Sequence, residues 1–250
     1  MKLTGNTILI TGGTSGIGRA LAEEFHDRGN RVIIAGRRQD RLDEIAAARP
    51  DITGIALDVD DTKALAAFAD RVRREFPELN IVFNNAGFAR DEDLTGDLDL
   101  VTAQAIIETN IVAVLNVTGA LLPQLRAQDH AAFVTTTSGL AFVPRSNYPT
   151  YCATKAFLHS WLQSLRTQLS ATSIEVLELV PPYVQTEFGG DRQLNDPAAM
   201  PLAEFISEVL AILENGDTPN GEILVDRVKP LRWAERDGRY DQVYAGLNAG

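Results

Sequence analysis

The sequence predicts an α/β fold in which a doubly wound parallel sheet of about seven strands lies between two layers of helices. Three observations predict it. Short runs rich in β-branched residues recur along the chain, and most are apolar throughout, as in strands that a parallel sheet buries on both faces. Stretches with helical periodicity separate these runs, which implies βαβ units with right-handed crossovers. The length, 250 residues, is one that a single α/β domain often reaches.

The predicted strands are spaced so that a helix fits between most neighbouring pairs. One such helix is indicated by the apolar spacing around Leu21 and another by the spacing around Phe68. Asp40 and Asp61 stand just before helical stretches, where a carboxylate can accept hydrogen bonds from free N–H groups. No repeat or linker interrupts the pattern, so residues 1–250 are predicted to form one domain. The predicted strands are residues 7–11, 31–35, 53–57, 81–83, 132–136, 174–180 and 222–225.

The chain carries 23 Lys and Arg residues against 34 Asp and Glu residues, a net charge of −11 at pH 7. This acidity argues against nucleic acid or an anionic membrane as the main partner, because both are polyanions. It still allows a local basic pocket for one small anionic ligand. A single cysteine excludes an internal disulfide framework, and the three histidines lack partners at metal-ligand spacing, so no metal site is predicted. No signal-peptide or membrane-spanning segment is evident, which predicts a cytoplasmic protein.

A glycine-rich turn joins the first predicted strand to the first predicted helix. It reads Gly-Gly-Thr-Ser-Gly-Ile-Gly over residues 12–18. Glycines let the backbone approach a pyrophosphate closely, while the helix N-terminus offers free N–H groups to the phosphate charge. A tight turn without a ligand is the alternative, and the strand before it and the helix after it favour a nucleotide loop. The residues predicted to bind a cofactor here are Gly12, Thr14, Ser15, Gly16, Ile17 and Gly18.

The spacing of these glycines resembles the nucleotide loop of the short-chain dehydrogenases/reductases, in their single-domain branch. Three further motifs match the same family in order and spacing. Asn-Asn-Ala-Gly closes the fourth predicted strand at residues 84–87, and Tyr-x-x-x-Lys runs from Tyr151 to Lys155. Ser138 precedes that tyrosine by thirteen residues, and Asn110 lies in a long helix between the motifs. The resemblance covers most of the chain and implies a Rossmann-type fold, a nicotinamide cofactor and oxidoreductase activity.

The end of the second predicted strand indicates which cofactor is bound. In dinucleotide folds an acidic residue there binds the ribose 2′-hydroxyl of NAD, whereas a 2′-phosphate favours arginine. The sequence has Gly36 where the family's NAD users have Asp, followed by Arg37 and Arg38. A guanidinium fork suits phosphate oxygens, so we predict NADP(H) over NAD(H), the alternative being two solvated arginines. By resemblance, Asp58 and Val59 contact the adenine and Asn85, Ala86 and Gly87 line the ribose side, while Asn85 equally suits a structural role between strands.

Tyr151 and Lys155 are four residues apart, so on a helix both point to the same face. Reduction of a carbonyl needs a proton donor at oxygen, and the pKa of an isolated tyrosine, about 10, is too high for that near neutrality. We expect the Lys155 ammonium to lower the pKa of Tyr151 and make it a usable general acid and base. Ser138 is placed to hold the substrate oxygen. By resemblance, Asn110 holds a water that links Lys155 to solvent; a turn serine and a buried amide are the structural alternatives.

The chain departs from the family after the sixth predicted strand, where Pro182 replaces a glycine and stiffens the loop. Thr186 is in register with the family's threonine, and by resemblance Val184 offers its backbone to the nicotinamide carboxamide. The proline pair, with Lys-Ala-Phe-Leu-His-Ser at residues 155–160, resembles the bacterial DltE-like subgroup. Residues 187–200 are expected to form a mobile substrate lid.

These observations predict NADP(H)-dependent interconversion of a carbonyl and an alcohol by hydride transfer. A catalytically silent, nucleotide-sensing protein is the alternative, and the intact Ser, Tyr, Lys and Asn weigh against it. An epimerase or dehydratase of the longer branch is disfavoured by the short chain and the loop spacing. By resemblance, helices over residues 98–127 and 149–171 form the interface of a homodimer or homotetramer. Residues 231–236 are predicted to form a short helix over the active-site rim or an interface.

Overall fold

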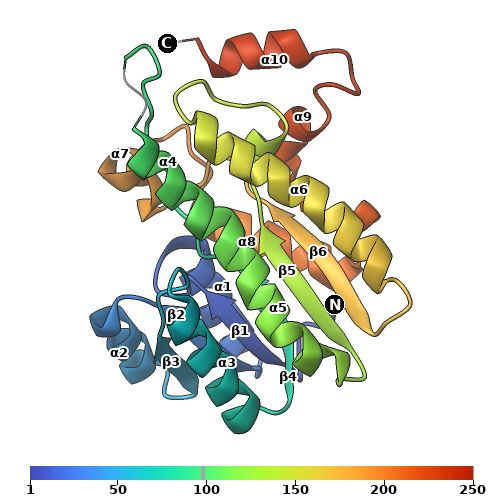
Figure 1. Ribbon diagram of the computed structural model, residues 1–250. Helices are drawn as coiled ribbons and strands as arrows, with labels where there is room; N and C mark the ends of the chain where they lie inside the picture. Colours follow the sequence, from blue (N-terminus) through green and yellow to red (C-terminus); the bar gives the residue numbers. More distant parts are fainter. Residues whose placement is uncertain (97–98, 250) are drawn as a thin grey trace.

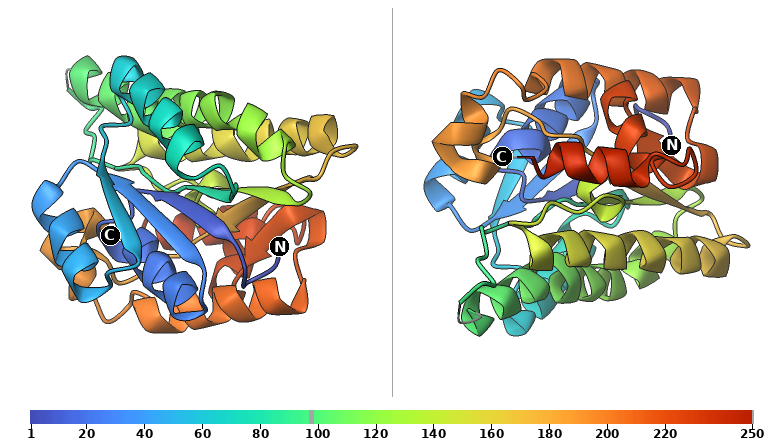
Figure 2. Two further views of the ribbon diagram at one scale, coloured as in Figure 1. Left: turned by 90° about the horizontal axis from the view of Figure 1, so that it is seen from below. Right: turned by 90° about the horizontal axis from the view of Figure 1, so that it is seen from above.

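The structure is a computed structural model that describes residues 1–96 and 99–249. Within these residues seven strands form one parallel sheet in the order β3-β2-β1-β4-β5-β6-β7, and helices cover both of its faces (Figures 1 and 2). The predicted three-layer α/β class is confirmed, and each strand lies within two residues of its predicted range. The strands are β1 Thr7–Thr11, β2 Arg31–Gly36, β3 Ile52–Ala56, β4 Leu79–Asn84, β5 Ala131–Thr136, β6 Ile174–Val180 and β7 Glu222–Leu224.

The helices cover the two faces of the sheet in two groups, and each group forms one layer of the hydrophobic core with the sheet. One layer packs α1, α2 and α8 against the sheet, and the other packs α3, α5 and α6 against it. The shorter helices α7, α9 and α10 lie toward the edge where the strands end (Figure 1). The helices are α1 Gly16–Asp27, α2 Gln39–Ala48, α3 Thr62–Glu75, α4 Leu100–Ile107, α5 Ala113–Arg126, α6 Pro149–Leu169, α7 Gly190–Leu194, α8 Leu202–Asn215, α9 Lys229–Arg232 and α10 Tyr240–Leu247.

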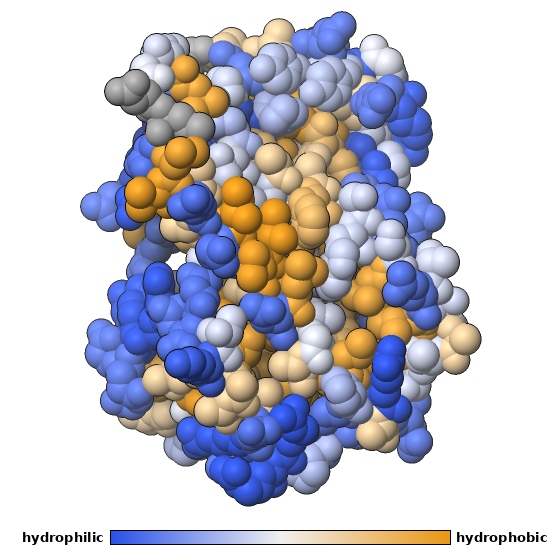
Figure 3. Space-filling model, viewed as in Figure 1, coloured by the Kyte–Doolittle hydropathy of each residue, from blue (hydrophilic) through white to orange (hydrophobic). Residues whose placement is uncertain are grey.

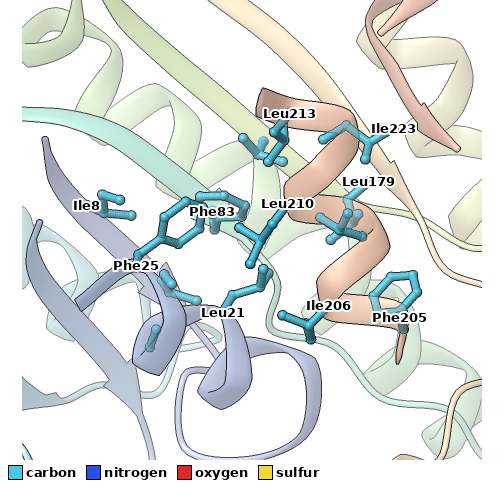
Figure 4. Close-up of a cluster of buried hydrophobic side chains, with 14 of the residues drawn as sticks. Ile8, Leu21, Phe25, Phe83, Leu179, Phe205, Ile206, Leu210, Leu213 and Ile223 are labelled. Carbon is cyan, nitrogen blue, oxygen red and sulfur yellow. The ribbon is translucent and has the colours of Figure 1, made fainter. Parts of the chain in front are cut away.

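Alternating side chains along each strand feed the two core layers in turn. Ile8 and Ile10 of β1 belong to the layer that includes α1 and α8, whereas Leu9 belongs to the opposite layer. In the first layer the rings of Phe25 and Phe83 lie 5.4 Å apart between centroids (Figure 4). Each large apolar side chain buried in this way stabilises the fold by about 1.5–3 kcal/mol. The core therefore holds the sheet rigid beneath the edge where the strands end.

The two predicted helix caps differ in outcome. Asp61 is the N-cap of α3, and its carboxylate accepts hydrogen bonds from the N–H groups of Lys63 and Ala64 at 2.9 and 3.0 Å. The prediction for Asp40 is wrong, because α2 begins at Gln39 and its N-cap is Arg38. Asp40 therefore lies inside the first turn, where its charge favours the helix dipole but caps no N–H group.

A π-helical turn, Glu108–Val112, joins α4 to α5 without a break in the helix. Together they match the helix predicted over residues 98–127, of which Leu98 lies outside the described residues. A π turn accommodates one more residue than an α turn and often marks a functional position. The buried residue of this turn is Asn110, one of the predicted site residues. The companion helix α6 ends at Leu169, two residues before the predicted 171.

The continuous helix Leu100–Arg126 is long and apolar enough to cross a membrane by length and composition, with a mean hydropathy of 1.7 in its most apolar window. This helix was not singled out from the sequence, and core helices of folded domains meet the same criteria of length and composition. Its buried face carries Val117, Leu121 and Leu125, which belong to the core layer shared with α3 and α6. We accordingly interpret it as a core helix of the sheet.

Candidate active site

The predicted site residues gather at the edge of the sheet where the strands end. Strand order reverses between β1 and β4, since the chain runs from β1 outward to β3 and then returns to β4 on the other side. In doubly wound sheets the crevice at such a switch point is where ligands bind. The loops that follow β1, β2, β4, β5 and β6 all meet here (Figure 1).

The glycine-rich loop after β1 fits closely against its neighbours. Gly12 and Gly16 have φ of 66° and 51°, conformations that side-chain-bearing residues rarely adopt. A Cβ at Gly18 would lie 2.4 Å from the Gly12 carbonyl oxygen and 2.4 Å from Nδ2 of Asn85. Ser15 is the N-cap of α1 but makes no side-chain hydrogen bond to it. The N-terminus of α1 therefore points into the crevice without a cap from its own side chain, as an anion site requires.

A cluster of arginines lies beside this loop at the end of β2. Arg38 donates hydrogen bonds to the hydroxyls of Ser15 at 2.8 Å and Thr14 at 3.2 Å. Arg41, on the next turn of α2, is a third cation here that the sequence reasoning missed. Arg37 is exposed, and among the described residues its side chain has no hydrogen-bond or ion-pair partner. Arg37 and Arg38 thus directly follow Gly36 in the chain, and Arg38 reaches back to the glycine-rich loop.

A side chain at position 36 would compete for space with Thr14. A Cβ at residue 36 would lie 2.9 Å from Cγ2 of Thr14, so the Thr14 side chain would have to shift to admit an aspartate there. Glycine at the end of β2 therefore lets Thr14 pack directly against this strand.

Two further predicted cofactor positions make hydrogen bonds that stabilise the fold. The side-chain amide of Asn85 donates to the carbonyl oxygen of Thr11 at 3.2 Å and accepts from the Thr136 hydroxyl at 3.2 Å. It thus links β1 and β5 across β4, which is the structural role considered for it. Asp58 accepts from the N–H of Asp60 at 3.2 Å and so shapes the turn after β3. Neighbouring Val59 packs against the core layer of α3.

The helix α6 brings together the two residues of the Tyr-x-x-x-Lys motif. Tyr151 and Lys155 are 8% and 4% exposed, and the Lys155 Nζ lies 5.6 Å from the centroid of the Tyr151 ring. The Lys155 ammonium donates a hydrogen bond to the carbonyl oxygen of Thr136 at the end of β5, at 2.9 Å. Ser138, two residues further on, is 8% exposed and caps a short turn by accepting from the N–H of Leu140 at 3.1 Å.

Burial controls the titration of both groups in the cofactor-free protein. Desolvation lowers the pKa of Lys155 to about 8, opposed by the negative charge of Glu178. Desolvation likewise raises the pKa of Tyr151 far above its ordinary value, while the neighbouring Ser138 hydroxyl acts to lower it. The expectation that Lys155 lowers the pKa of Tyr151 is therefore wrong for this state. Loss of water around the phenol outweighs an ammonium that lies over the ring.

Asn110 connects the π turn to the site through fully satisfied hydrogen bonds. Its Oδ1 accepts from the N–H of Phe88, and its Nδ2 donates to the carbonyl oxygen of Phe88, both at 3.0 Å. Nδ2 also donates to the Thr154 hydroxyl at 3.1 Å. A Cβ at Gly87 would lie 3.0 Å from the Asn110 Oδ1 and 3.7 Å from the Lys155 Nζ, so glycine is what lets the loop after β4 pass between them.

The loop after β6 makes contact with the lid segment, residues 187–200. The carbonyl oxygen of Val184 accepts a hydrogen bond from the Gln193 side chain at 2.7 Å, and the Thr186 hydroxyl accepts a second one at 3.2 Å. Thr186 also approaches the glycine loop, because a Cβ at Gly16 would lie 3.4 Å from its side chain. The loop after β6 therefore closes the crevice over the glycine loop.

A buried charged network lies behind the site, between α6 and the strands β6 and β7. His159 contacts Glu178 at 2.8 Å, and Glu222 accepts a bidentate pair of hydrogen bonds from Arg232 at 2.6 and 2.8 Å. The prediction that the histidines lack carboxylate partners is wrong for His159, because its partners come from distant strands. The atoms of His159, Glu178 and Glu222 that could bind a metal ion lie within 4.8 Å of one another, but the Glu222 carboxylate is already paired with Arg232.

The C-terminal segment packs against this network and the turn that carries Ser138. The short helix predicted over residues 231–236 is misplaced: α9 ends at Arg232, and residues 233–236 form turns. Leu231 of α9 would lie 2.7 Å from a Cβ at Gly139. The Arg232 guanidinium lies over the Phe142 ring at 4.5 Å, and that ring contacts His159 edge-on. The C-terminal segment therefore supports the wall of the crevice next to Ser138.

The sequence model of the family described as short chain dehydrogenase matches residues 6–196. The chain is a short-chain dehydrogenase. It is 40% identical over 252 aligned residues to the uncharacterized oxidoreductase DltE of Bacillus subtilis, covering 99% of this chain and 98% of that protein. This confirms the predicted family and agrees with the DltE-like resemblance.

Solved structures of short-chain dehydrogenases share the fold over nearly the whole chain. One from Sphingobium yanoikuyae in complex with NADPH has a TM-score of 0.80 and 27% identity, covering 96% of this chain and 95% of that one. Another, from Burkholderia phymatum in complex with NAD, has a TM-score of 0.81 and 20% identity, covering 100% and 98%. The chain is thus an oxidoreductase of this family.

Proposed function

We propose that this short-chain dehydrogenase interconverts a carbonyl compound and an alcohol by hydride transfer with NADP(H), using Tyr151 as general acid and base. The observation that carries the proposal is the convergence of Tyr151, Lys155 and Ser138 beside the glycine-rich loop at one edge of the sheet. No comparable group of proton-transferring side chains borders that loop among residues 1–96 and 99–249.

The residues at the crevice fit a dinucleotide. A Cβ at Gly12 or Gly18 would meet backbone atoms at 2.9 and 2.4 Å, so only glycine lets the loop pack this closely against Ala86 and against the start of α1. This close packing is typical of a dinucleotide-binding turn. The proposed cofactor contacts are those predicted from the sequence: Gly12, Thr14, Ser15, Gly16, Ile17, Gly18, Arg37, Arg38, Asp58, Val59, Asn85, Ala86, Gly87, Tyr151, Lys155, Val184 and Thr186. When bound, the nicotinamide supplies or accepts the hydride.

The arginines at the end of β2 support NADP(H) as the cofactor. Arg38 already reaches the glycine-rich loop through Ser15, and Gly36 carries no carboxylate that would bind a free ribose hydroxyl. The relative from Sphingobium yanoikuyae was solved with NADPH and the one from Burkholderia phymatum with NAD. Titration of the protein with NADPH and with NADH tests the proposal. We expect NADPH to bind more tightly, and Arg38→Ala should lower the ratio of the affinity for NADPH to the affinity for NADH. Equal affinity, or an unchanged ratio in Arg37→Ala and Arg38→Ala, would refute it.

In the reduction direction the Ser138 hydroxyl holds the substrate oxygen and Tyr151 donates the proton to it. In the cofactor-free protein burial raises the pKa of Tyr151, so the phenol is protonated, and transfer of its proton depends on stabilisation of the phenolate that forms. The Lys155 ammonium then stabilises the phenolate that remains, and Asn110 keeps the Phe88 backbone and Thr154 in place around them. Lys155 then returns a proton to the phenolate, and a water held near Asn110 is the proposed route by which Lys155 regains one from solvent.

The decisive variant is Tyr151→Phe, which removes the proton donor and keeps the ring contact with Phe188 at 5.8 Å between centroids. We expect no measurable oxidation of NADPH with any aldehyde or ketone in a broad panel, while NADPH titration gives an unchanged dissociation constant. Retained turnover would refute the role of Tyr151. A wild-type protein that binds NADPH tightly but reduces no carbonyl would instead favour the nucleotide-sensing alternative.

The exposed face of α4 and α6 supports assembly into a homodimer or homotetramer. Leu100, Val101 and Ile107 on α4 are 59%, 78% and 41% exposed, and Phe157 on α6 is 41% exposed. Apolar surface gathers over this face in Figure 3. Exposed apolar patches of this kind mark association sites, so we propose that this face pairs with a second copy. A monomer in light scattering would refute it.

We further propose that the substrate is a small carbonyl compound or alcohol and that the enzyme acts in the cytoplasm. A panel of aldehydes, ketones and secondary alcohols, followed through NADPH absorbance, identifies the substrate class. Cell fractionation with an antibody against the native chain tests the location, and recovery in the membrane pellet would contradict it.

A further inference from the structure

The lid segment places its own side chains on three positions of the cofactor and substrate crevice. Glu187 lies at the arginine cluster, Phe188 lies against Tyr151, and Gln193 lies at the loop after β6. These residues belong to one short stretch that leads from Thr186 into α7. Three side chains of one short segment therefore contact three places where cofactor or substrate is proposed to bind.

At the first position a carboxylate occupies the arginines. The Glu187 oxygens lie 3.8 Å from a guanidinium nitrogen of Arg38 and 3.6 Å from one of Arg41. All three side chains are roughly half exposed, so the ion pairs are weak and exchangeable. A phosphate monoester carries about −1.5 to −2 charges and three acceptor oxygens, so it competes for the same guanidinium groups more strongly than one carboxylate does.

At the second position a side-chain amide takes the acceptors of the loop after β6. Gln193 donates to the Val184 carbonyl oxygen at 2.7 Å and the Thr186 hydroxyl at 3.2 Å. The donor is a primary carboxamide, the same group that nicotinamide carries. At the third position the Phe188 ring, itself 44% exposed, lies 5.8 Å from the Tyr151 ring and covers the proposed proton donor.

We propose that Glu187 is a specificity-determining residue: its carboxylate holds the lid over the crevice, and the 2′-phosphate of NADP(H) displaces it from Arg38 and Arg41. The inference rests on the proposed function and extends it, because it couples recognition of the 2′-phosphate to uncovering of Tyr151. The neutral 2′-hydroxyl of NAD(H) cannot displace a carboxylate from a guanidinium, so the lid stays in place. Discrimination between the cofactors then operates through the lid as well as through direct contacts.

Nucleotide fragments without nicotinamide test the coupling separately from catalysis. In the wild-type protein, saturating adenosine 2′,5′-bisphosphate should speed hydrogen exchange at the amides of residues 187–194, and saturating 5′-AMP should not. In Glu187→Gln these amides should exchange rapidly without ligand, and the bisphosphate should bind about two- to tenfold tighter, because weak exposed ion pairs no longer compete with it. The affinity for 5′-AMP should not change.

The matched control is Asp191→Asn, which removes a carboxylate from the same lid at a position without an ion pair among the described residues. It should behave as the wild type. A gain in affinity is informative, because a residue that merely supports the structure would lose affinity on replacement. The inference is overturned if Glu187→Gln exchanges and binds as the wild type does, or if the bisphosphate slows exchange in the lid. If the bisphosphate binds no tighter than 5′-AMP to either protein, the NADP(H) assignment itself fails.

Discussion

Replacing Lys155 by Met should stabilise the cofactor-free protein while abolishing its activity. The Lys155 ammonium is 4% exposed, and its burial lowers its pKa from 10.5 to about 8. Methionine has a similar length and no charge, so the substitution removes the desolvation cost without opening a large cavity. Activity is lost because the proposed phenolate partner is gone.

The size of the effect follows from the pKa. Each pKa unit corresponds to about 1.4 kcal/mol, so a fall from 10.5 to about 8 costs the folded state about 3 kcal/mol at pH 7. The hydrogen bond to the Thr136 carbonyl oxygen, worth about 1 kcal/mol, is lost in the variant. The net gain is about 2 kcal/mol, or roughly 4–8 °C in Tm for a domain of this size.

The sign of the pH dependence is fixed by linkage. Below about pH 8 lysine is charged in both folded and unfolded chains, so the full cost is present. Between about pH 8 and 10.5 the unfolded state binds more protons, so the wild type gains stability as the pH rises, and the advantage of Lys155→Met disappears.

Urea denaturation at pH 7 and pH 10, without cofactor, measures both quantities. Lys63→Met, at an exposed position of α3, is the control and should change the unfolding free energy by less than about 0.5 kcal/mol. A Lys155→Met variant less stable than the wild type at pH 7, or an advantage equally large at pH 10, would refute the reasoning.

Three further substitutions test the supports of the site. Arg232→Met leaves Glu222 buried without its cation, and the unfolding free energy in urea should fall by about 3–5 kcal/mol; an unchanged value would mean that the pair contributes nothing. Gly18→Ala forces a Cβ to within 2.4 Å of a backbone oxygen, so stability should fall by about 1–3 kcal/mol and NADPH should bind more weakly by titration, whereas Gly246→Ala, with nothing within 4 Å, should do neither. Asp61→Ala removes the cap of α3 and should lower the unfolding free energy by about 1 kcal/mol, seen as a lower urea midpoint.

The fold was predictable because its signals are local. Strands such as Arg31–Gly36 contain a continuous apolar run, and the turns between elements carry glycine, asparagine or aspartate. The site motifs were predictable for a similar reason, since Tyr151 and Lys155 share one helix face and the glycines share one turn. The residue at which a helix begins is harder to predict from sequence. Asp40 is the second residue of α2 and not its N-cap.

The missed features all depend on contacts between segments distant in the chain. Nothing in the sequence near His159 indicates that Glu178 and Glu222 will lie beneath it, because they come from two neighbouring strands. The pairing of Arg41 with Glu187 likewise joins α2 to the lid. The pKa of Tyr151 was predicted with the wrong sign because the motif reveals the lysine but not the burial that outweighs it.

Because of the π-helical turn Glu108–Val112, the geometry of the candidate site depends on a single residue of chain length. Deleting one residue there would let α4 and α5 run on as a regular helix and would change the direction in which the turn presents Asn110. Asn110 would then turn away from Phe88, and the loop after β4 would lose both hydrogen bonds that hold it. The extra residue therefore makes the helix less regular, and in exchange it keeps Asn110 in the position that shapes the crevice.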